Sequence, residues 1–212
     1  MSEPVKVTLL CGGGQSSRVV FHQLVSSGID VFAIIESREP TGRFFRRRAK
    51  RLGWIRTIGQ IGYLIIAKIQ RRFYAKRTDQ VFTDAGLSDL PIPADRCFEV
   101  QSVNSSEAIV KLRDTDPDVV VVNGTRIIAK RMIESTQAPF VNTHLGITPR
   151  YRGVYGGYWA RVLRDDDNVG ATIHIVDTGI DTGTILRQAR VAKPDLGHSC
   201  LLPAIQLRDI VA

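Results

Sequence analysis

The chain has 212 residues, of which 43% are hydrophobic and 24% charged, and its formal net charge is +8. Its length suits a folded domain with a substantial core, and its composition excludes a disordered or fibrous protein. Three widely separated cysteines, Cys11, Cys97 and Cys200, argue against a disulfide framework and indicate reduced intracellular thiols. The excess of Lys and Arg favours an anionic partner such as a phosphate, a nucleic acid or an anionic membrane surface.

The N-terminal sequence MSEPVKVTLLCGGG lacks the basic start and long apolar run of a signal peptide, so we expect a cytoplasmic protein. An apolar run over 5–11 predicts a buried strand that ends in a glycine turn. Apolar residues at helical spacing over 17–28 and a second apolar run over 31–35 follow. This β-α-β opening is typical of a parallel sheet with helices on both faces.

The glycine turn consists of Gly12, Gly13 and Gly14 and opens the first helix. Backbone N–H groups at such a helix start can hold a phosphate. The spacing is not that of a dinucleotide-binding GxGxxG, and no Lys-Ser/Thr pair follows as in a P-loop. Phosphate binding and a plain strand-to-helix turn both remain open.

Residues 43–77 form a basic segment, in which charge clusters of this kind are usually a solvated helix face. The apolar run over 58–69 is shorter than the roughly 20 residues that a membrane-spanning helix needs. It suits a core helix, a partner interface such as a homodimer seam, or a helix lying on a membrane surface. We favour a core or interface helix, with peripheral membrane contact through 43–77 as the alternative.

The alternation of strands and helices then resumes. Apolar runs predict strands over 97–100, 119–122 and 138–144, and two further strands within 170–191. We expect helices over 105–117 with Ser105 as N-cap, over 127–135, from Gly156 to 167, and over 199–212 with an interruption at Pro203. We therefore expect an α/β fold, a Rossmann-like, mostly parallel twisted sheet with helices on both faces. No repeat or linker divides 1–212, so we expect a single domain.

Asn142 and His144 end the predicted strand over 138–144. Residues two apart on a strand share a face, so both side chains point into one space. Ligands of open α/β sheets bind at the carboxyl ends of the strands. A carboxamide beside an imidazole can stabilise a developing oxyanion. This pair is the strongest candidate site in the sequence, although a single His is more often structural.

Two Asp-Thr-Gly units, 177–179 and 181–183, share one predicted turn and place a carboxylate near its apex. A calcium loop would need more oxygen ligands at regular spacing. An aspartic protease would carry the two copies far apart on an all-β fold. The turn therefore indicates a positioned carboxylate, and no His or Cys spacing indicates a metal site.

Together the segments VVVVNGTRII, VNTHLGITPRYRG, GGYWA and VGATIHIVDTGIDTGTIL resemble the formyltransferase family, over roughly residues 117–192. The resemblance implies a catalytic set of Asn142, His144 and Asp181, with His174 as a support. It implies N10-formyltetrahydrofolate as donor, a primary amine as acceptor and no metal. It also places the donor's pterin against Arg126, Ile127 and Ile128 and against the loop that contains Asp177, Gly179 and Ile180.

The sequence THLGITPRYRGVYGGYWA, residues 143–160, most resembles formyltransferases that act on nucleotide-linked amino sugars for lipopolysaccharide O-antigen or surface glycans. The basic excess suits an anionic nucleotide. Candidate anion contacts are Arg152, the amides of Gly12, Gly13 and Gly14, and one of Arg46 to Arg48.

Glycinamide ribonucleotide and methionyl-tRNA remain as alternative acceptors. So does a non-catalytic nucleotide- or membrane-binding module on the same fold. We expect no nucleic-acid partner, because no recognised binding motif accompanies the charge.

Overall fold

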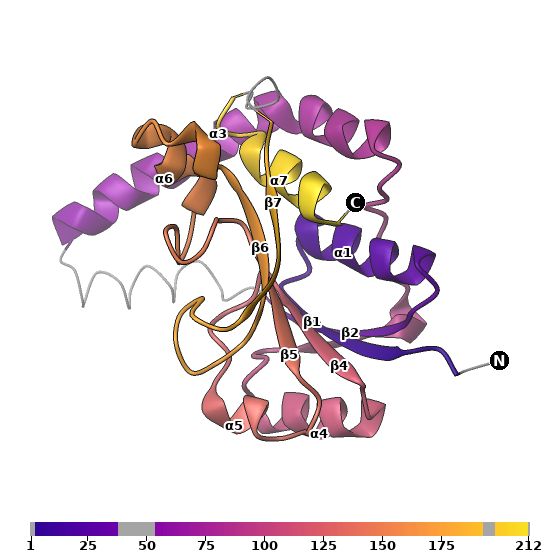
Figure 1. Cartoon of the computed structure of the whole chain (residues 1–212). Helices are drawn as coiled ribbons and strands as arrows, with labels where there is room; N and C mark the ends of the chain where they lie inside the picture. The colour runs from indigo at the N-terminus through magenta and orange to yellow at the C-terminus, as the bar shows by residue number, and fades with distance from the viewer. Residues whose placement is uncertain (1–2, 38–53, 193–197, 212) are drawn as a thin grey trace.

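The computed structural model describes residues 3–37, 54–192 and 198–211, without the side chains of 54–65, 67 and 71. A seven-stranded sheet lies between helices (Figure 1). The strands are β1 (Lys6–Cys11), β2 (Asp30–Glu36), β3 (Cys97–Val100), β4 (Val119–Asn123), β5 (Phe140–His144), β6 (Gly170–Ile175) and β7 (Ile185–Arg190). The helices are α1 (Gln15–Ser26), α3 (Trp54–Asp84), α4 (Ser106–Thr115), α5 (Lys130–Ile133), α6 (Gly156–Val162) and α7 (Leu202–Val211), with short 3-10 turns η1 (Ala94–Arg96) and η2 (Asp166–Asn168).

The strand order is β3-β2-β1-β4-β5-β6-β7. Neighbouring strands pair in parallel from β3 through β2, β1 and β4 to β5. β6 pairs antiparallel with β5, and β7 pairs antiparallel with β6. The chain builds outward from β1 through β2 and β3, then returns to the other side of β1 with β4. Ligands of open α/β sheets bind at such a switch point. The predicted α/β fold with a mostly parallel sheet is confirmed.

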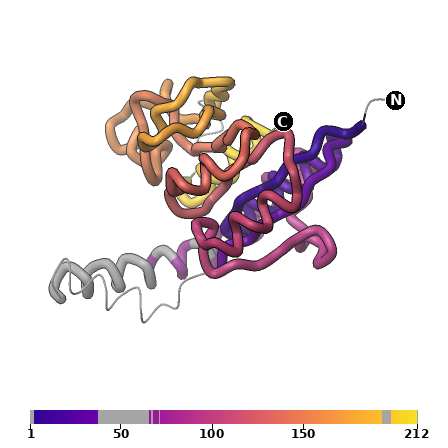
Figure 2. Tube along the Cα trace, turned by 90° about the horizontal axis from the view of Figure 1, so that it is seen from below, coloured from indigo at the N-terminus to yellow at the C-terminus, as the bar shows by residue number. Residues whose placement is uncertain are grey.

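Helices cover both faces of the sheet. α1 and α7 pack on one face, with α3 beyond α7, and α4 and α5 cover the other (Figures 1 and 2). Consecutive residues Leu9 and Leu10 of β1 are fully buried in the two opposite core clusters. This double burial explains why β1 is a continuous apolar run rather than an alternating one.

Local signals placed some helix ends correctly and others wrongly. Ser105 caps α4 as expected, because its hydroxyl accepts a hydrogen bond from Ala108 N at 3.1 Å. The helix expected from Gly156 to 167 stops at Val162, and Arg164 follows with φ +57°. Pro203 does not interrupt the last helix, contrary to our prediction. It lies in the first turn of α7, where its missing N–H costs no helical hydrogen bond.

The apolar run predicted over 58–69 falls inside α3, which spans 31 residues. Its described side chains Ile66 and Ile69 are 57% and 51% exposed, so this part of the run does not lie in the core, and the interface that we named beside the core stays a prediction. Residues 43–53 of the basic segment lie outside the described residues. Within the described chain, no helix is both long enough and apolar enough to cross a membrane.

Candidate active site

Asn142 and His144 at the end of β5 both face the carboxylate of Asp181. Asn142 Nδ2 donates to Asp181 Oδ1 at 3.3 Å, and His144 Nδ1 lies 3.4 Å from Asp181 Oδ2. The two β5 residues share a face because strand side chains alternate. Asp181 comes from the loop between β6 and β7, 39 residues beyond Asn142. The structure thus brings the carboxamide, the imidazole and the carboxylate together in one cluster.

A fourth side chain, His174 of β6, completes this cluster. It pairs with Asn142 across the antiparallel β5–β6 ladder, and its Nε2 lies 3.1 Å from Asn142 Nδ2. His174 Nδ1 donates to the Ile175 carbonyl at 2.8 Å, because a carbonyl can only accept. In the neutral ring Nε2 therefore accepts from Asn142, and in the charged ring it donates toward Asp181 Oδ1, 3.4 Å away. His174 therefore supports Asn142 as an acceptor when its ring is neutral, and contacts Asp181 as a donor when its ring is charged.

The surroundings of His174 and Asp181 shift both pKa values in the directions that favour the imidazolium and the carboxylate. The hydrogen bond to Asp181 raises the pKa of His174 above its ordinary value of 6.5, although burial opposes the shift. Burial alone would raise the pKa of Asp181. Hydrogen bonds with His174 and from the Gly153 N–H, together with nearby His144, outweigh burial and lower the pKa of Asp181 below 3.8. At neutral pH Asp181 is a carboxylate surrounded by donors.

The backbone holds Asp181 in an unusual position. Its φ is +50°, in the left-handed region that non-glycine residues seldom adopt, and its Oδ2 accepts from Gly153 N at 2.7 Å. Asp177 closes the same loop by accepting from Gly179 N at 3.0 Å and from Thr182 Oγ1 at 2.6 Å. The two Asp-Thr-Gly units therefore differ in use: the first closes the loop and the second aims a carboxylate into the cluster.

The loop after β5 folds back onto His144. His144 Nε2 donates to the Tyr151 carbonyl at 2.8 Å. A Cβ added at Gly146 would lie 2.4 Å from that carbonyl oxygen and 2.6 Å from His144 Nε2, so only glycine allows this contact. The Tyr151 hydroxyl donates to Asp165 at 2.7 Å, and Arg150 pairs with the same carboxylate at 2.7 Å. The loop is thus fixed at several points around the imidazole.

A polar cavity of about 330 Å³ lies at the switch point between β1 and β4, beside the strand that carries the cluster. Its lining includes Gly12, Gly14, Ser16, Ser17, Glu36, Ser37, Gly124, Thr125 and Arg126. Gly12 N donates to the Asn123 carbonyl at 3.3 Å, so this amide is not available to a phosphate. A Cβ at Gly12 would lie 2.3 Å from the Gly124 oxygen, which explains the first glycine of the turn.

Glu36 at the end of β2 fixes the rim of this cavity. Its buried carboxylate accepts from Val103 N at 3.0 Å and from Thr125 Oγ1 at 2.9 Å. It also pairs with Arg126 Nε at 2.5 Å and lies 3.4 Å from Arg126 N. With four donors around it, Glu36 holds the segment after β4 in place.

The expected donor-binding residues lie on two segments that adjoin one core cluster. Ile128 belongs to that cluster, and Val176, next to Asp177, packs against it. Ile127 and Ile180 are exposed, so their side chains are available to a ligand, whereas the buried Ile128 side chain is not.

Among the expected anion contacts, Arg152 is exposed and stands between two residues whose backbones hold the cluster, Tyr151 and Gly153. Arg46, Arg47 and Arg48 lie outside the described residues. Within the described chain, no group of three or more His, Cys, Asp and Glu side chains could hold a metal ion.

Sequence reasoning missed several supports of the site. The roles of Glu36, Thr125 and the Gly153 amide depend on long-range contacts, and that of the Tyr151 carbonyl depends on how the irregular loop after β5 folds back. The one local signal was an acidic residue at the end of the second strand, directly after an apolar run.

Comparison with known proteins identifies the family and the fold of the chain. The model of the formyl transferase family matches residues 66–194. The methionyl-tRNA formyltransferase of Desulfotalea psychrophila is 34% identical over 118 residues, which cover 49% of this chain and 36% of that protein. That of Myxococcus xanthus is 35% identical over 97 residues, covering 45% of this chain and 31% of that protein. The chain thus matches about a third of the length of these relatives.

Solved structures share the fold at low sequence identity. Glycinamide ribonucleotide transformylase 1 of Symbiobacterium toebii superposes with a TM-score of 0.58 and 16% identity, over 98% of this chain and 82% of that one. A sugar N-formyltransferase of Shewanella sp. FDAARGOS_354 gives a TM-score of 0.51 and 14% identity, over 98% of this chain and 70% of that one.

Proposed function

The chain belongs to the formyl transferase family, and from this premise we propose that it transfers a formyl group from N10-formyltetrahydrofolate to a primary amine. The proposal is carried by one observation. Asn142, His144 and Asp181, from two distant segments, meet within hydrogen-bonding distance at the carboxyl end of β5. A hydrogen-bond donor, an imidazole and a carboxylate in contact can serve acyl transfer without a metal.

The reaction follows from these groups. The neutral acceptor amine attacks the formyl carbon, a C–N bond forms, and the carbonyl electron pair moves onto oxygen. Asn142 Nδ2–H and a ring N–H of His144 stabilise this oxyanion. Asp181 accepts the proton that the amine loses, directly or through a water. The oxyanion then re-forms the carbonyl as the C–N10 bond breaks, N10 takes the proton that Asp181 received, and tetrahydrofolate and the formamide leave.

Both donors must change partners when substrate binds. Asn142 Nδ2 is now shared between His174 and Asp181, and His144 Nε2 is held by the Tyr151 carbonyl. Hydrogen bonds of a catalytic group often realign in the substrate complex. A charged His174 would donate to Asp181 itself and leave one Asn142 N–H for the oxyanion.

For the acceptor we propose a nucleotide-linked amino sugar. The cavity at the switch point beside β4 is polar, and its lining includes Gly14 and Arg126, which suit a phosphorylated group. The exposed Arg152 and the net charge of +8 favour an anionic substrate. Similarity to methionyl-tRNA formyltransferases supports a second candidate, an aminoacyl-tRNA.

The proposal is tested by following tetrahydrofolate release from N10-formyltetrahydrofolate with a panel of acceptors. The panel contains amino-sugar nucleotides, glycinamide ribonucleotide and methionyl-tRNA, and mass spectrometry identifies the formylated product. We expect turnover with one class and its loss in Asn142→Ala. If no amine is formylated and the donor does not raise the melting temperature, the protein is a binding module and the proposal is wrong.

A further inference from the structure

The outer part of α3 carries an apolar stripe that the fold does not cover. Ile66, Ile69 and Phe73 follow each other at intervals of three and four residues, so they share one side of the helix. They are 57%, 51% and 81% exposed. An uncovered stripe of this kind marks a contact with something outside the domain.

A different side of α3 makes the contacts with the rest of the protein. Tyr74 stacks on His198 with ring centroids 4.3 Å apart, and Phe82 is buried in the core. α3 lies along the top of the molecule in Figure 1, above α7. The apolar stripe is therefore not a misplaced core surface, since the helix is already anchored without it.

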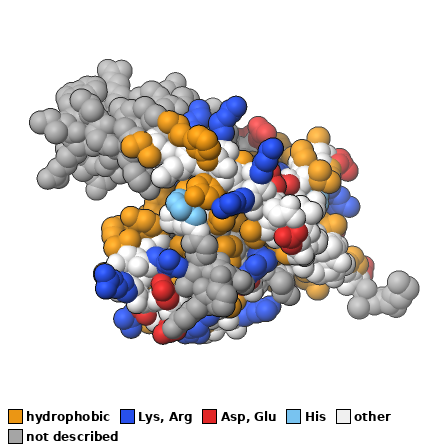
Figure 3. Space-filling view, turned by 90° about the horizontal axis from the view of Figure 1, so that it is seen from above, with side chains coloured by type: hydrophobic (Ala, Val, Ile, Leu, Met, Phe, Trp, Pro, Cys, Tyr) orange, Lys and Arg blue, Asp and Glu red, His pale blue; other side chains and the backbone are white. Residues whose placement is uncertain are grey.

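Cations flank the apolar stripe. Lys68, Arg72 and Lys76 follow one another at intervals of four residues and are exposed. None of these three forms an ion pair with another described residue. The sequence from Arg43 to Arg77 contains no Asp or Glu. In the view from above, hydrophobic side chains lie close to Lys and Arg side chains on this face (Figure 3).

We infer that the stripe of Ile66, Ile69 and Phe73, with Lys68, Arg72 and Lys76 beside it, docks the protein on an anionic lipid surface. The three apolar side chains enter the boundary between headgroups and acyl chains, and the cations contact headgroup phosphates. The inference depends on this surface alone and not on the proposed reaction.

The positive charge and the apolar side chains of this surface together favour an anionic lipid surface over other partners. A second copy of the chain would bring an equally cationic stripe against the first, and like charges would repel. A nucleic acid offers phosphates but no apolar surface for Ile66 and Ile69. An anionic bilayer satisfies both groups at once, because its phosphates lie directly above its acyl chains.

The test is sedimentation of the whole chain with phosphatidylcholine vesicles, with and without phosphatidylglycerol. We expect binding only to the anionic vesicles, and weaker binding as salt is raised. Phe73→Ser should reduce the partition coefficient about tenfold or more. Lys68→Gln and Arg72→Gln should each reduce it about fivefold. Phe73→Leu should restore binding, since it returns an apolar side chain.

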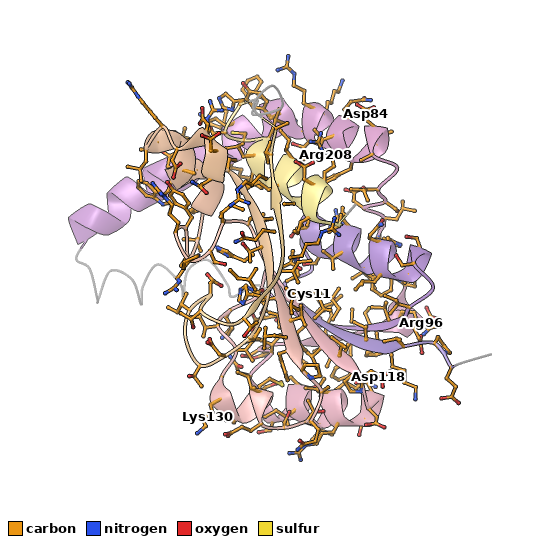
Figure 4. All side chains as sticks on the ribbon, in the orientation of Figure 1. Cys11, Asp84, Arg96, Asp118, Lys130 and Arg208 are labelled. Carbon is orange, nitrogen blue, oxygen red and sulfur yellow. The ribbon has the colours of Figure 1, made fainter. Side chains whose placement is uncertain are left out.

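Two matched variants serve as controls. Val110→Ser removes an apolar side chain from the exposed face of α4, where Val110 is 57% exposed. Lys130→Gln removes an exposed cation from α5, at the other end of the molecule from α3 (Figure 4). Both should bind anionic vesicles like the wild type.

Three results would overturn the inference. The first is equal binding to neutral and anionic vesicles. The second is equal loss of binding in the α3 variants and the controls. The third is no vesicle binding, with polynucleotide binding that Lys68→Gln and Arg72→Gln weaken, which would identify a nucleic acid as the occupant.

Discussion

Replacing Asp181 with Asn tests the cluster most economically, because the two side chains have nearly the same shape. Asp181 Oδ1 accepts from Asn142 and faces His174, while Oδ2 accepts from Gly153 N and faces His144. In Asp181→Asn one of these oxygens becomes an NH2 group. Whichever way the amide turns, a donor points at a donor.

The stability change should be modest. A hydrogen bond to a charged group contributes about 1.5–3 kcal/mol, and one such bond is lost. Removing a partly buried charge offsets some of that loss. We expect the free energy of unfolding to fall by about 1–2 kcal/mol, which lowers the melting temperature by roughly 2–8 °C in a chain of this size.

The activity change should be much larger than the stability change. Proton transfer by a positioned side chain typically contributes about 10²–10⁴-fold to a rate. We therefore expect kcat/KM for formyl transfer to fall by about 10²–10⁴-fold while the protein remains folded at room temperature. Tetrahydrofolate release measures the rate, and circular dichroism on heating measures the stability.

Asp181→Glu provides the matched control, since it keeps the charge but moves the carboxylate by one methylene away from the Gly153 amide. It should lose less activity than Asp181→Asn. If Asp181→Asn keeps kcat/KM within about tenfold of the wild type, the carboxylate takes no part in proton transfer and the mechanism is refuted.

The pKa shifts predict a pH window. The stability that Asp181 contributes is present above pH 3.8 and is lost as pH falls through its lowered folded pKa. The stability that His174 contributes is present below pH 6.5 and is lost as pH rises through its raised folded pKa. Urea unfolding should show stability falling above pH 6.5 more steeply in the wild type than in His174→Gln, and equal slopes would contradict this. In Glu36→Gln the new NH2 group faces groups that are themselves hydrogen-bond donors, so the free energy of unfolding should fall by about 1–3 kcal/mol. Because Glu36 fixes the rim of the cavity, the KM for N10-formyltetrahydrofolate or for the acceptor should rise. Unchanged stability and KM would reject the role given to Glu36. Gly12→Ala places a Cβ against backbone and should cost about 1–3 kcal/mol on thermal unfolding, whereas Gly14→Ala meets nothing within 4 Å and should be nearly neutral. Equal effects of the two alanines would contradict the crowding at the turn.

Much of the fold could be predicted because its signals are local. The apolar run of β1 reflects burial on both faces, and the Ser105 hydroxyl caps the helix that follows it. The pairing of Asn142 and His144 followed from the two-residue period of a strand. These features need only neighbouring residues to be recognised.

Other features could not be predicted because they depend on contacts between distant segments. His174 supports Asn142 only because β6 runs antiparallel to β5 in one register. Glu36 reaches Thr125 and Arg126 across 89 and 90 residues of sequence. The 31-residue length of α3 also escaped detection, since glycines at Gly59 and Gly62 weaken the helical pattern.

The central claim is that Asn142, His144 and Asp181 act as one catalytic unit. It is tested most directly by measuring kcat for formyl transfer in the three single alanine variants and in the triple variant. A unit predicts that the triple variant is no more than about tenfold slower than the most damaged single variant. Losses that multiply across the three positions, or a single variant with wild-type turnover, would show that the side chains meet without sharing a reaction.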